Sequence, residues 1–243
     1  MLTGIGTVVA YNSVSMHKVT GTIQEIGFVE GQTVHPGSLI AQLDPRPFQA
    51  ALAQAQASLQ RDQAHLENAQ ANLGRSIPLE KRGYASPQLV GNQAASVSEQ
   101  QAAVASDKAA IANAQTQLSY TTIKSPIDGV TGIRGIDIGN IVQPTDVTPI
   151  VTITQVQPIS IVFALPQKNV PTVQAAMARG TLTAIAYSAD ATTELGTGTL
   201  LLLNNMISQS SGTVELKATF PNANRALWPG RICFGASGDR DAA

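Results

Sequence analysis

Apolar side chains recur every seven residues in two alanine-rich and glutamine-rich segments of the chain. Leucines carry the repeat in the first segment, and mostly valines carry it in the second. The first series is Leu52, Leu59, Leu66 and Leu73, and the second is Val90, Val97, Val104, Ile111 and Leu118. A repeat of seven is typical of helices that wind around each other in a left-handed coiled coil. The two segments are therefore predicted to be helices that meet along an apolar seam.

The two series also predict how the helices pair. The residue numbers of Leu66 and Val97 add up to the same total as those of Leu59 and Val104, and the other pairs of the series agree. An antiparallel hairpin requires a constant total, because each step up one helix is a step down the other. The centre of the hairpin then falls just before Gly83, and glycine is a common helix stop.

The predicted hairpin spans residues 47–121. Ser86 followed by Pro87 suits the N-cap and first turn of the second helix. Pro45 and Pro47 are tolerated at the start of the first helix, where no intrahelical donor is lost. Helices of about 26 to 31 residues would make a rod of roughly 40 to 45 Å.

The outward faces of both predicted helices are polar. They carry Gln, Asn, Ser and Asp and have no second apolar stripe, which favours a projecting rod over a helix pair buried in a bundle. Asp62 and Asp107 are assigned to this solvated surface, without a paired acid/base role. Pro78 cannot donate a hydrogen bond to the carbonyl of Gly74, so the first helix is expected to kink or end near Gly74.

The segments on either side of the hairpin resemble each other. Residues 13–46 and 122–154 both contain short alternating apolar runs separated by glycines, the pattern of short strands joined by tight turns. Neither half is long enough to bury an apolar face alone. Together they are predicted to form one small β-sandwich, interrupted by the hairpin.

The last third of the chain predicts a second β unit. The expected elements are strands at 159–165 and 195–203 and a short helix at 170–179. Residues 1–12 with 155–236 are predicted to form a six-stranded β-barrel, and residues 237–243 a disordered tail. Cys233 lies near that tail and is expected to react readily with thiol reagents.

Composition limits the chemistry of the chain. Its 15 basic and 16 acidic residues give a net charge of -1, which argues against a nucleic-acid partner. The single cysteine excludes an intrachain disulfide, and His17, His35 and His65 lack the spacing of a metal site. No apolar stretch reaches the about 18 to 20 residues of a membrane span. We therefore expect no catalytic residue, no cofactor and no metal, and a structural role rather than an enzyme.

One half of the predicted sandwich resembles the biotinyl/lipoyl carrier fold. The residues that carry this resemblance are Gly21, Ile23, Ile26, Phe28, Gly31, Val34, Gly37 and Leu39. A lipoyl-like sandwich split by an α-hairpin is the layout of the periplasmic adaptor (membrane fusion protein) family of RND-type multidrug pumps. The run Phe220-Pro221-Asn222, followed by Pro229-Gly230, is similar to the barrel signature of that family. The resemblance implies an elongated, multi-domain α+β protein.

The same resemblance implies a function. Members of the family bridge an inner-membrane RND transporter and an outer-membrane channel, as a homo-oligomer of about six copies in the periplasm at the inner membrane, and so export drugs and other toxic compounds. Arg75, Leu79 and Ser86 match the family motif Arg-x3-Leu-x6-Ser, which is associated with binding to the channel. Ser86 also suits a helix N-cap, and both roles can hold together.

Alternatives to an RND adaptor remain open. The chain could serve an ABC-type or type I exporter, or it could be a biotin or lipoyl carrier. A carrier presents a modifiable lysine between its halves, where this chain has Leu43-Asp44-Pro45, and Lys124 lies past the return of the hairpin. Family members also fold a membrane-proximal β-domain from both chain ends, and that domain is expected to be absent here.

Overall fold

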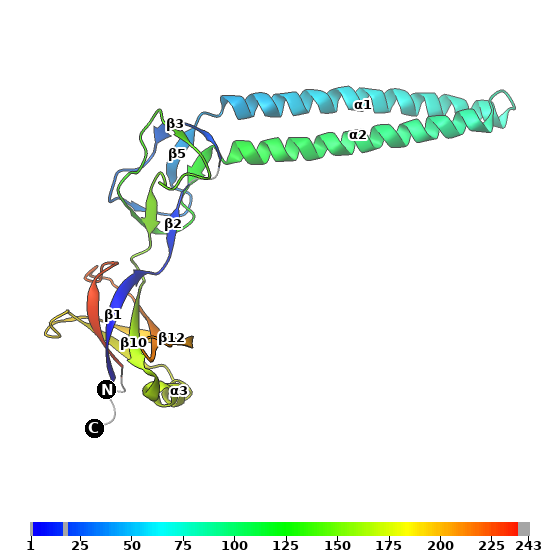
Figure 1. Cartoon of the computed structure of the whole chain (residues 1–243). Coiled ribbons are helices and arrows are strands. Elements are labelled where there is room, and N and C mark those ends of the chain that lie inside the picture. Colours follow the sequence, from blue (N-terminus) through cyan, green and yellow to red (C-terminus); the bar gives the residue numbers. More distant parts are fainter. Residues whose placement is uncertain (1, 17–18, 238–243) are drawn as a thin grey trace.

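The computed structural model describes residues 2–16 and 19–237 and shows an elongated α+β molecule. A β-barrel and a small β-sandwich lie end to end, and a helical hairpin projects sideways from the sandwich, which gives the molecule a bent outline (Figure 1). The fold class therefore agrees with the prediction.

The hairpin consists of two long antiparallel helices, α1 (Arg46–Lys81) and α2 (Pro87–Ser119). With 36 and 33 residues they exceed the predicted lengths, and a rise of 1.5 Å per residue makes the rod about 50 Å long. The turn lies at the predicted place, where Gly83 has a positive φ of 81°. Ser86 caps α2 as predicted, since its Oγ accepts a hydrogen bond from the backbone N–H of Leu89 at 3.2 Å.

Pro78 does not end the first helix, so the expectation of a helix end near Gly74 is wrong, while the alternative of a kink there stays a prediction. Helix α1 continues past the proline to Lys81. Both Gly74 and Pro78 are exposed, and the space where a Gly74 side chain would lie is open. The carbonyl that the proline leaves without a donor therefore lies on an exposed face of the helix, where water can solvate it.

The sandwich is built from two four-stranded sheets, and each sheet takes strands from both sides of the hairpin. The first sheet contains, in order, β2 (Ser13–Ser15), β9 (Thr152–Thr154), β7 (Gly129–Thr131) and β4 (Thr33–Val34). The second contains β6 (Thr122–Lys124), β5 (Leu39–Leu43), β3 (Gly21–Ile26) and β8 (Ile141–Val142). Residues fully buried between them include Ile23, Ile40, Leu43, Ile150 and Ile153. Neither half could bury this core alone, which explains why they combine.

The rod is attached through two neighbouring strands of the sandwich. Strand β5 leads into α1, and α2 returns into β6, which pairs with β5 in antiparallel fashion. The side chain of Gln42 reinforces this root: it donates to the carbonyl oxygen of Thr121 at 3.1 Å and accepts from the Thr122 hydroxyl at 2.9 Å. The two helices are thus held at the base of the rod by one ladder of hydrogen bonds.

The barrel is closed by six strands, as predicted. In order around the barrel they are β1 (Leu2–Ala10), β10 (Ile159–Pro166), β13 (Thr213–Phe220), β12 (Glu194–Ser208), β11 (Thr183–Tyr187) and β14 (Ile232–Ser237). A 3-10 turn (Gln167–Asn169) leads into helix α3 (Val170–Met177), whose Val173 belongs to the barrel core. Phe163, Leu216 and Phe220 fill the interior.

Cys233 is buried in the barrel wall, so its predicted reactivity is wrong. The last strand, β14, pairs with the first strand, β1, and places Cys233 opposite Gly6. Its side chain is fully buried, and burial raises the pKa of the thiol. Strand β14 also includes Ser237, the first residue of the predicted tail. The rest of that tail, 238–243, lies outside the described residues, as does His17.

Candidate functional site at the tip of the hairpin

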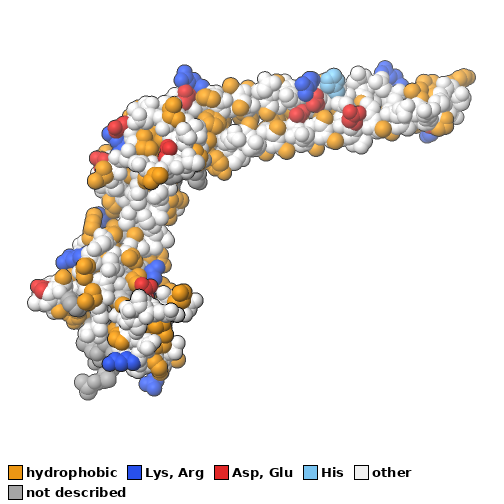
Figure 2. Space-filling view, in the orientation of Figure 1, with side chains coloured by type: hydrophobic (Ala, Val, Ile, Leu, Met, Phe, Trp, Pro, Cys, Tyr) orange, Lys and Arg blue, Asp and Glu red, His pale blue; other side chains and the backbone are white. Residues whose placement is uncertain are grey.

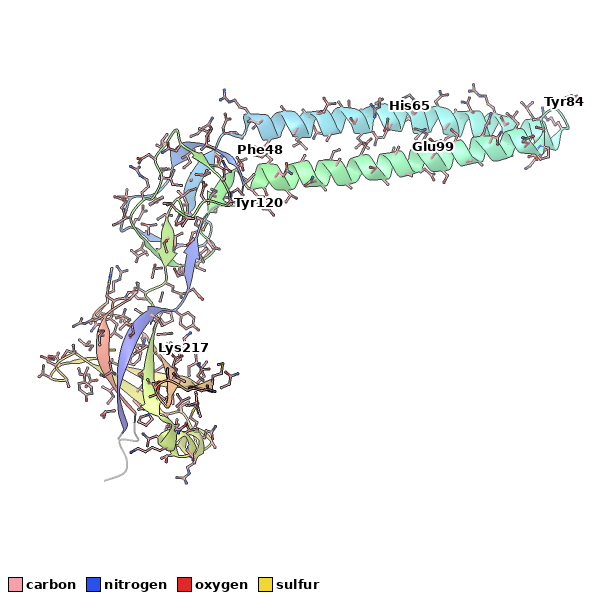
Figure 3. The ribbon with its side chains drawn as sticks, in the orientation of Figure 1. Phe48, His65, Tyr84, Glu99, Tyr120 and Lys217 are labelled. Atoms are coloured by element: carbon pink, nitrogen blue, oxygen red, sulfur yellow. The ribbon has the colours of Figure 1, made fainter. Side chains whose placement is uncertain are left out.

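The free end of the rod gathers apolar side chains on its surface. Tyr84 lies in the turn at the far end of the hairpin (Figure 3) and is 80% exposed. Leu79 and Leu89, on the two helices next to this turn, are 44% and 45% exposed. Other large apolar side chains of the described chain are also exposed, such as Ile133 and Val147 in loops of the sandwich, but the tip carries several at one projecting end. Apolar groups exposed together at the end of a projecting rod indicate a contact surface.

Cationic side chains surround this apolar end. Arg75, Lys81 and Arg82 are exposed, and Glu80 is the one carboxylate among residues 75–89. Arg75 donates from Nη2 to Oδ1 of Asn72 at 2.6 Å, but no carboxylate among the described residues forms an ion pair with it. Its charge is therefore available to a partner.

Hydrogen bonds fix the shape of the turn. The carbonyl oxygen of Leu79 accepts from the backbone N–H groups of Arg82 and Tyr84, at 3.2 and 2.9 Å. Ser86 then caps α2. Because Leu79 and Ser86 anchor the two sides of the turn, the matched motif residues have a structural role in addition to any contact with a partner. Tyr84 was not among the predicted site residues. Only 4% of the residues in the chain are aromatic, so an aromatic residue in the predicted turn could have indicated a contact site.

Behind the tip, the nine predicted seam residues are all shielded from solvent to some degree. Val97 and Val104 are buried, at 9% and 7% exposure, and the other seven are half-buried. This is the burial that an apolar seam requires. Which residue of α1 faces which residue of α2 stays a prediction.

The structure corrects the assignment of Asp62 and Asp107 to the solvated surface. Their side chains contact each other across the hairpin. Asp62 follows the seam residue Leu59 by three positions, and Asp107 follows Val104 by three positions. In a heptad repeat two positions of every seven, three residues apart, face the partner helix, so the two carboxylates belong to the second column of the seam. The heptad pattern of apolar residues marks the first column of the seam but not this polar one.

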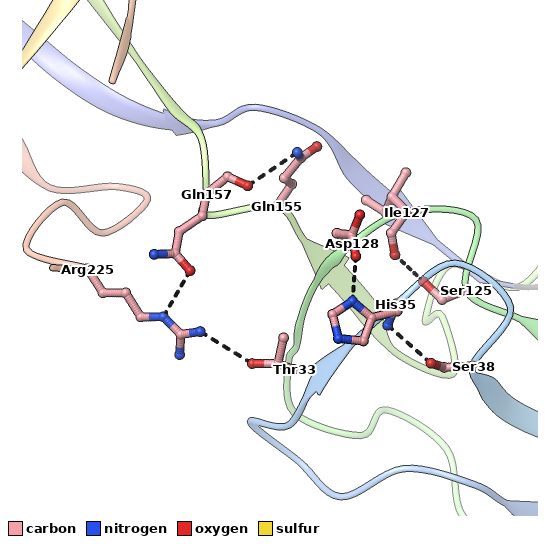
Figure 4. Close-up of polar contacts among 9 residues, drawn as sticks. All are labelled: Thr33, His35, Ser38, Ser125, Ile127, Asp128, Gln155, Gln157 and Arg225. Carbon is pink, nitrogen blue, oxygen red and sulfur yellow. Dashed lines mark hydrogen bonds and ion pairs between the residues drawn. The ribbon is translucent and has the colours of Figure 1, made fainter. Parts of the chain in front are cut away.

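A polar junction joins the barrel to the sandwich (Figure 4). Arg225, in the loop after β13, donates from Nε to Oε1 of Gln157 at 3.2 Å and from Nη2 to Oγ1 of Thr33 at 3.4 Å. Thr33 belongs to the sandwich and Gln157 to the connection between the two units. Close by, Nδ1 of His35 lies 2.6 Å from Oδ1 of Asp128. These contacts set how the two units lie relative to each other.

Asn222 organises the same loop from inside. Its Nδ2 donates to the carbonyl oxygens of Val156 and Leu227, both at 2.9 Å, and its Oδ1 accepts from the N–H of Leu227 at 3.0 Å. The residue is buried and has a positive φ of 53°, a conformation that asparagine tolerates better than most residues. This geometry explains why asparagine occupies the end of the Phe-Pro-Asn run.

Comparison with known proteins agrees with this arrangement of units. Residues 13–154 match the barrel-sandwich hybrid domain of RND membrane fusion proteins, and residues 158–233 match the β-barrel domain of the same proteins. The chain belongs to the RND membrane fusion protein family.

Two curated relatives of this membrane fusion protein carry the same name. The chain is 43% identical over 233 residues to the "Multidrug resistance protein MdtA" of Cronobacter turicensis, and 42% identical over 233 residues to that of Proteus mirabilis. The alignments cover 95% of this chain but 56% and 57% of those proteins. The chain therefore spans about half the length of the curated relatives that it matches.

Solved structures show the same fold. The membrane fusion protein Spr0693 of Streptococcus pneumoniae R6 superposes with a TM-score of 0.72 at 18% identity, covering 99% of this chain and 100% of that one. A chimera of MacA and MexA that contains the α-hairpin domain of Pseudomonas aeruginosa MexA gives a TM-score of 0.70 at 25% identity, covering 96% of this chain and 80% of that one.

Nothing in the described part of this membrane fusion protein is arranged as a metal site or as a membrane span. Residues 2–16 and 19–237 contain no group of three or more His, Cys, Asp or Glu placed to hold a metal ion. Within the same residues, no helix has the length and hydrophobicity that crossing a membrane requires. Lys124, the lysine considered for a carrier, lies within strand β6 opposite Leu39 and not at a turn between the sandwich halves.

The facing pairs of the seam can be tested with engineered disulfides. We expect the Leu66→Cys/Val97→Cys pair to crosslink on mild oxidation, because the predicted antiparallel register places these positions opposite each other. A disulfide needs a Cα to Cα distance below about 7 Å, so a pair shifted by one heptad cannot form one. Leu66→Cys/Val104→Cys is that shifted control. Each double variant carries Cys233→Ser, and the crosslinked fraction is read from mobility on non-reducing gels. Equal crosslinking of both pairs would contradict the register.

Proposed function

We propose that this membrane fusion protein is the periplasmic adaptor of a tripartite efflux pump. In this role it bridges an inner-membrane RND transporter and an outer-membrane channel, and drugs or other toxic compounds pass through the assembly. The observation that carries the proposal is a rod of about 50 Å whose exposed end combines apolar side chains with unpaired cations. The curated relatives are named as multidrug resistance proteins, which supports an export function.

The tip is suited to bind a protein surface of complementary chemistry. Arginine and tyrosine are the residues that most often dominate the binding energy of protein interfaces, and the tip offers Arg75 and Tyr84. The remaining cations favour a partner surface that carries carboxylates. We assign this surface to the periplasmic end of the outer-membrane channel, with Arg75, Leu79 and Ser86 of the motif at the contact.

The other two units are proposed to form the body of the assembly. About six copies would surround the exit of the transporter, at the periplasmic side of the inner membrane. The barrels of neighbouring copies would lie side by side in one ring, and the sandwiches in another. The protein then acts by coupling two membrane proteins mechanically, not by catalysis.

The proposal can be tested with a chimera, because the chain matches one continuous part of its relatives. We expect a protein in which this chain replaces the 233 matched residues of the Cronobacter turicensis relative to restore drug resistance to a strain that lacks that relative. Minimum inhibitory concentrations measure the effect. The control replaces residues 46–119 of the chimera by a short glycine-serine linker and should not restore resistance. A chimera that is exported, folded and abundant but leaves the strain sensitive would contradict the proposal.

A further inference from the structure

Two carboxyl groups lie inside the hairpin, about midway along the rod. Asp62 of α1 and Asp107 of α2 contact each other across the seam. Acidic and basic atoms lie next to each other in this part of the rod, which otherwise has few charges (Figure 2). Two carboxyl groups that face each other repel when both are ionised, so their presence at a seam needs an explanation.

The surroundings of the two groups differ. Arg61 holds Asp62 with two contacts, from Nε to Oδ1 at 2.7 Å and from Nη2 to Oδ2 at 3.2 Å, and the Asp62 side chain is 16% exposed. Asp107 has no such partner: its Oδ2 atom is buried and accepts no hydrogen bond within the described chain. An ionised Asp107 therefore lacks both water and a donor at this oxygen, whereas a protonated Asp107 can donate to the charged carboxylate of Asp62.

Only α1 and α2 pack against the pair, so few other charged groups influence it. From α1 these are Arg61 and, at longer range, His65, whose side chain is exposed. From α2 the next charged residue is Lys108, which is also exposed. The pKa of Asp107 is raised, mainly because the carboxyl group is desolvated and next because the negative charge of Asp62 is close. The positive charge of Arg61 lowers it by a smaller amount. Hydrogen bonding to Arg61 is the main cause that lowers the pKa of Asp62.

We propose that Asp62 and Asp107 form a proton-binding site in the seam, which stabilises the hairpin in acidic solution and loses that contribution as the pH rises. On acidification Asp107 takes up one proton from water and donates it in a hydrogen bond to Asp62, whose charge stays balanced by Arg61. On loss of that proton, two negative charges face each other beside a single arginine. The site belongs to the seam and is independent of the proposed docking of the tip.

The direction of the pH effect follows from the shifts. The folded seam binds the Asp107 proton more tightly than the unfolded chain does. The contribution of Asp107 to the free energy of unfolding is therefore complete below 3.8, the pKa of the unfolded chain, and is lost as pH rises through the raised pKa of the folded state. The contribution of Asp62 is present above 3.8 and is lost as pH falls through its lowered value. The hairpin is therefore most stable in the acidic range between these two transitions.

Thermal unfolding followed by the helical circular dichroism signal tests the site in the whole chain. We expect Asp107→Asn to raise the midpoint at about pH 8 and to have a smaller effect at pH 3.8, where the raised pKa keeps Asp107 mostly protonated, because the amide is neutral at both. Glu99→Gln is the matched control, since it removes an exposed carboxylate from the same helix, and it should behave like the parent chain at both pH values. An equal effect of the two substitutions, or no effect of Asp107→Asn at about pH 8, would overturn the proposal.

A second measurement needs no substitution. Carboxyl carbon NMR of the unaltered folded chain should show Asp107 titrating above, and Asp62 below, the ordinary value of 3.8. If Asp107 titrates at or below that value, the seam holds no proton and the site does not exist, whatever the variants show.

Discussion

Arg75→Asp is expected to abolish the drug resistance that the chimera confers, while the protein folds and accumulates normally. The residue is exposed at the end of the rod and its charge is not neutralised within the described chain, so its replacement removes no internal ion pair. Exposed substitutions of this kind change stability by about 0.5 kcal/mol or less. At a docked interface the same change places a carboxylate where a cation is needed, which typically weakens binding by about tenfold or more.

Two measurements separate docking from folding for this variant. Resistance is read from minimum inhibitory concentrations, and contact with the channel from crosslinking through a cysteine introduced at the exposed Gln88 in a Cys233→Ser background. Arg179→Asp is the matched control, because Arg179 is equally exposed but lies beside α3 at the far end of the molecule. We expect the control to retain the channel crosslink. An Arg75→Asp chimera that confers full resistance would remove Arg75 from the docking surface.

Asn222→Ala is expected to give the largest loss of stability among substitutions of polar residues, about 3 kcal/mol or more. Alanine leaves the buried carbonyl oxygens of Val156 and Leu227 and the N–H of Leu227 without their partner, and each buried unsatisfied group costs about 1 to 3 kcal/mol. Alanine also adopts a φ of 53° less readily than asparagine, whose short polar side chain can form local hydrogen bonds in this conformation, and this adds to the loss.

Urea unfolding followed by the fluorescence of Trp228, the only tryptophan in the chain, measures this loss. Asn222→Gly separates the two causes, because glycine accepts a positive φ but restores none of the hydrogen bonds, and it should recover only the smaller part. Asn224→Ala is the control: Asn224 is exposed in the same loop and accepts one hydrogen bond, from the N–H of Ala226 at 3.1 Å. If Asn222→Ala is no worse than Asn224→Ala, the buried amide does not hold the loop.

The hairpin could be predicted because its information is local and periodic. Leucines and valines at intervals of seven specify helices, an apolar face and the position of the turn, and the cap at Ser86 adds a sharp boundary. The second column of the seam was missed because it consists of Ala, Asp, Gln and Ser, which carry no hydrophobic signal. Asp62 and Asp107 are surface residues by type, and only the packing of α2 on α1 turns them inward.

Contacts between distant parts of the sequence could not be predicted from local patterns. Cys233 lies near the end of the chain, yet barrel closure places it against Gly6, in the first strand. The Arg225 contact to Thr33 joins residues 192 positions apart, and neither residue type specifies its partner. The continuation of α1 past Pro78 could not be predicted either. It is possible because the surroundings of Gly74 are open, so that water can solvate the carbonyl group that lacks a donor.

The way the rod is inserted makes its length a separable property of the protein. Both helices enter and leave through the adjacent strands β5 and β6, so the sandwich holds the base of the rod and makes no contact with its far end. Adding one heptad to each helix at facing positions would keep the seam in phase and move the tip outward by about 10 Å, with barrel and sandwich unchanged. Evolution could therefore adjust the reach of such a protein to the gap between two partners by paired insertions, without redesigning either β unit.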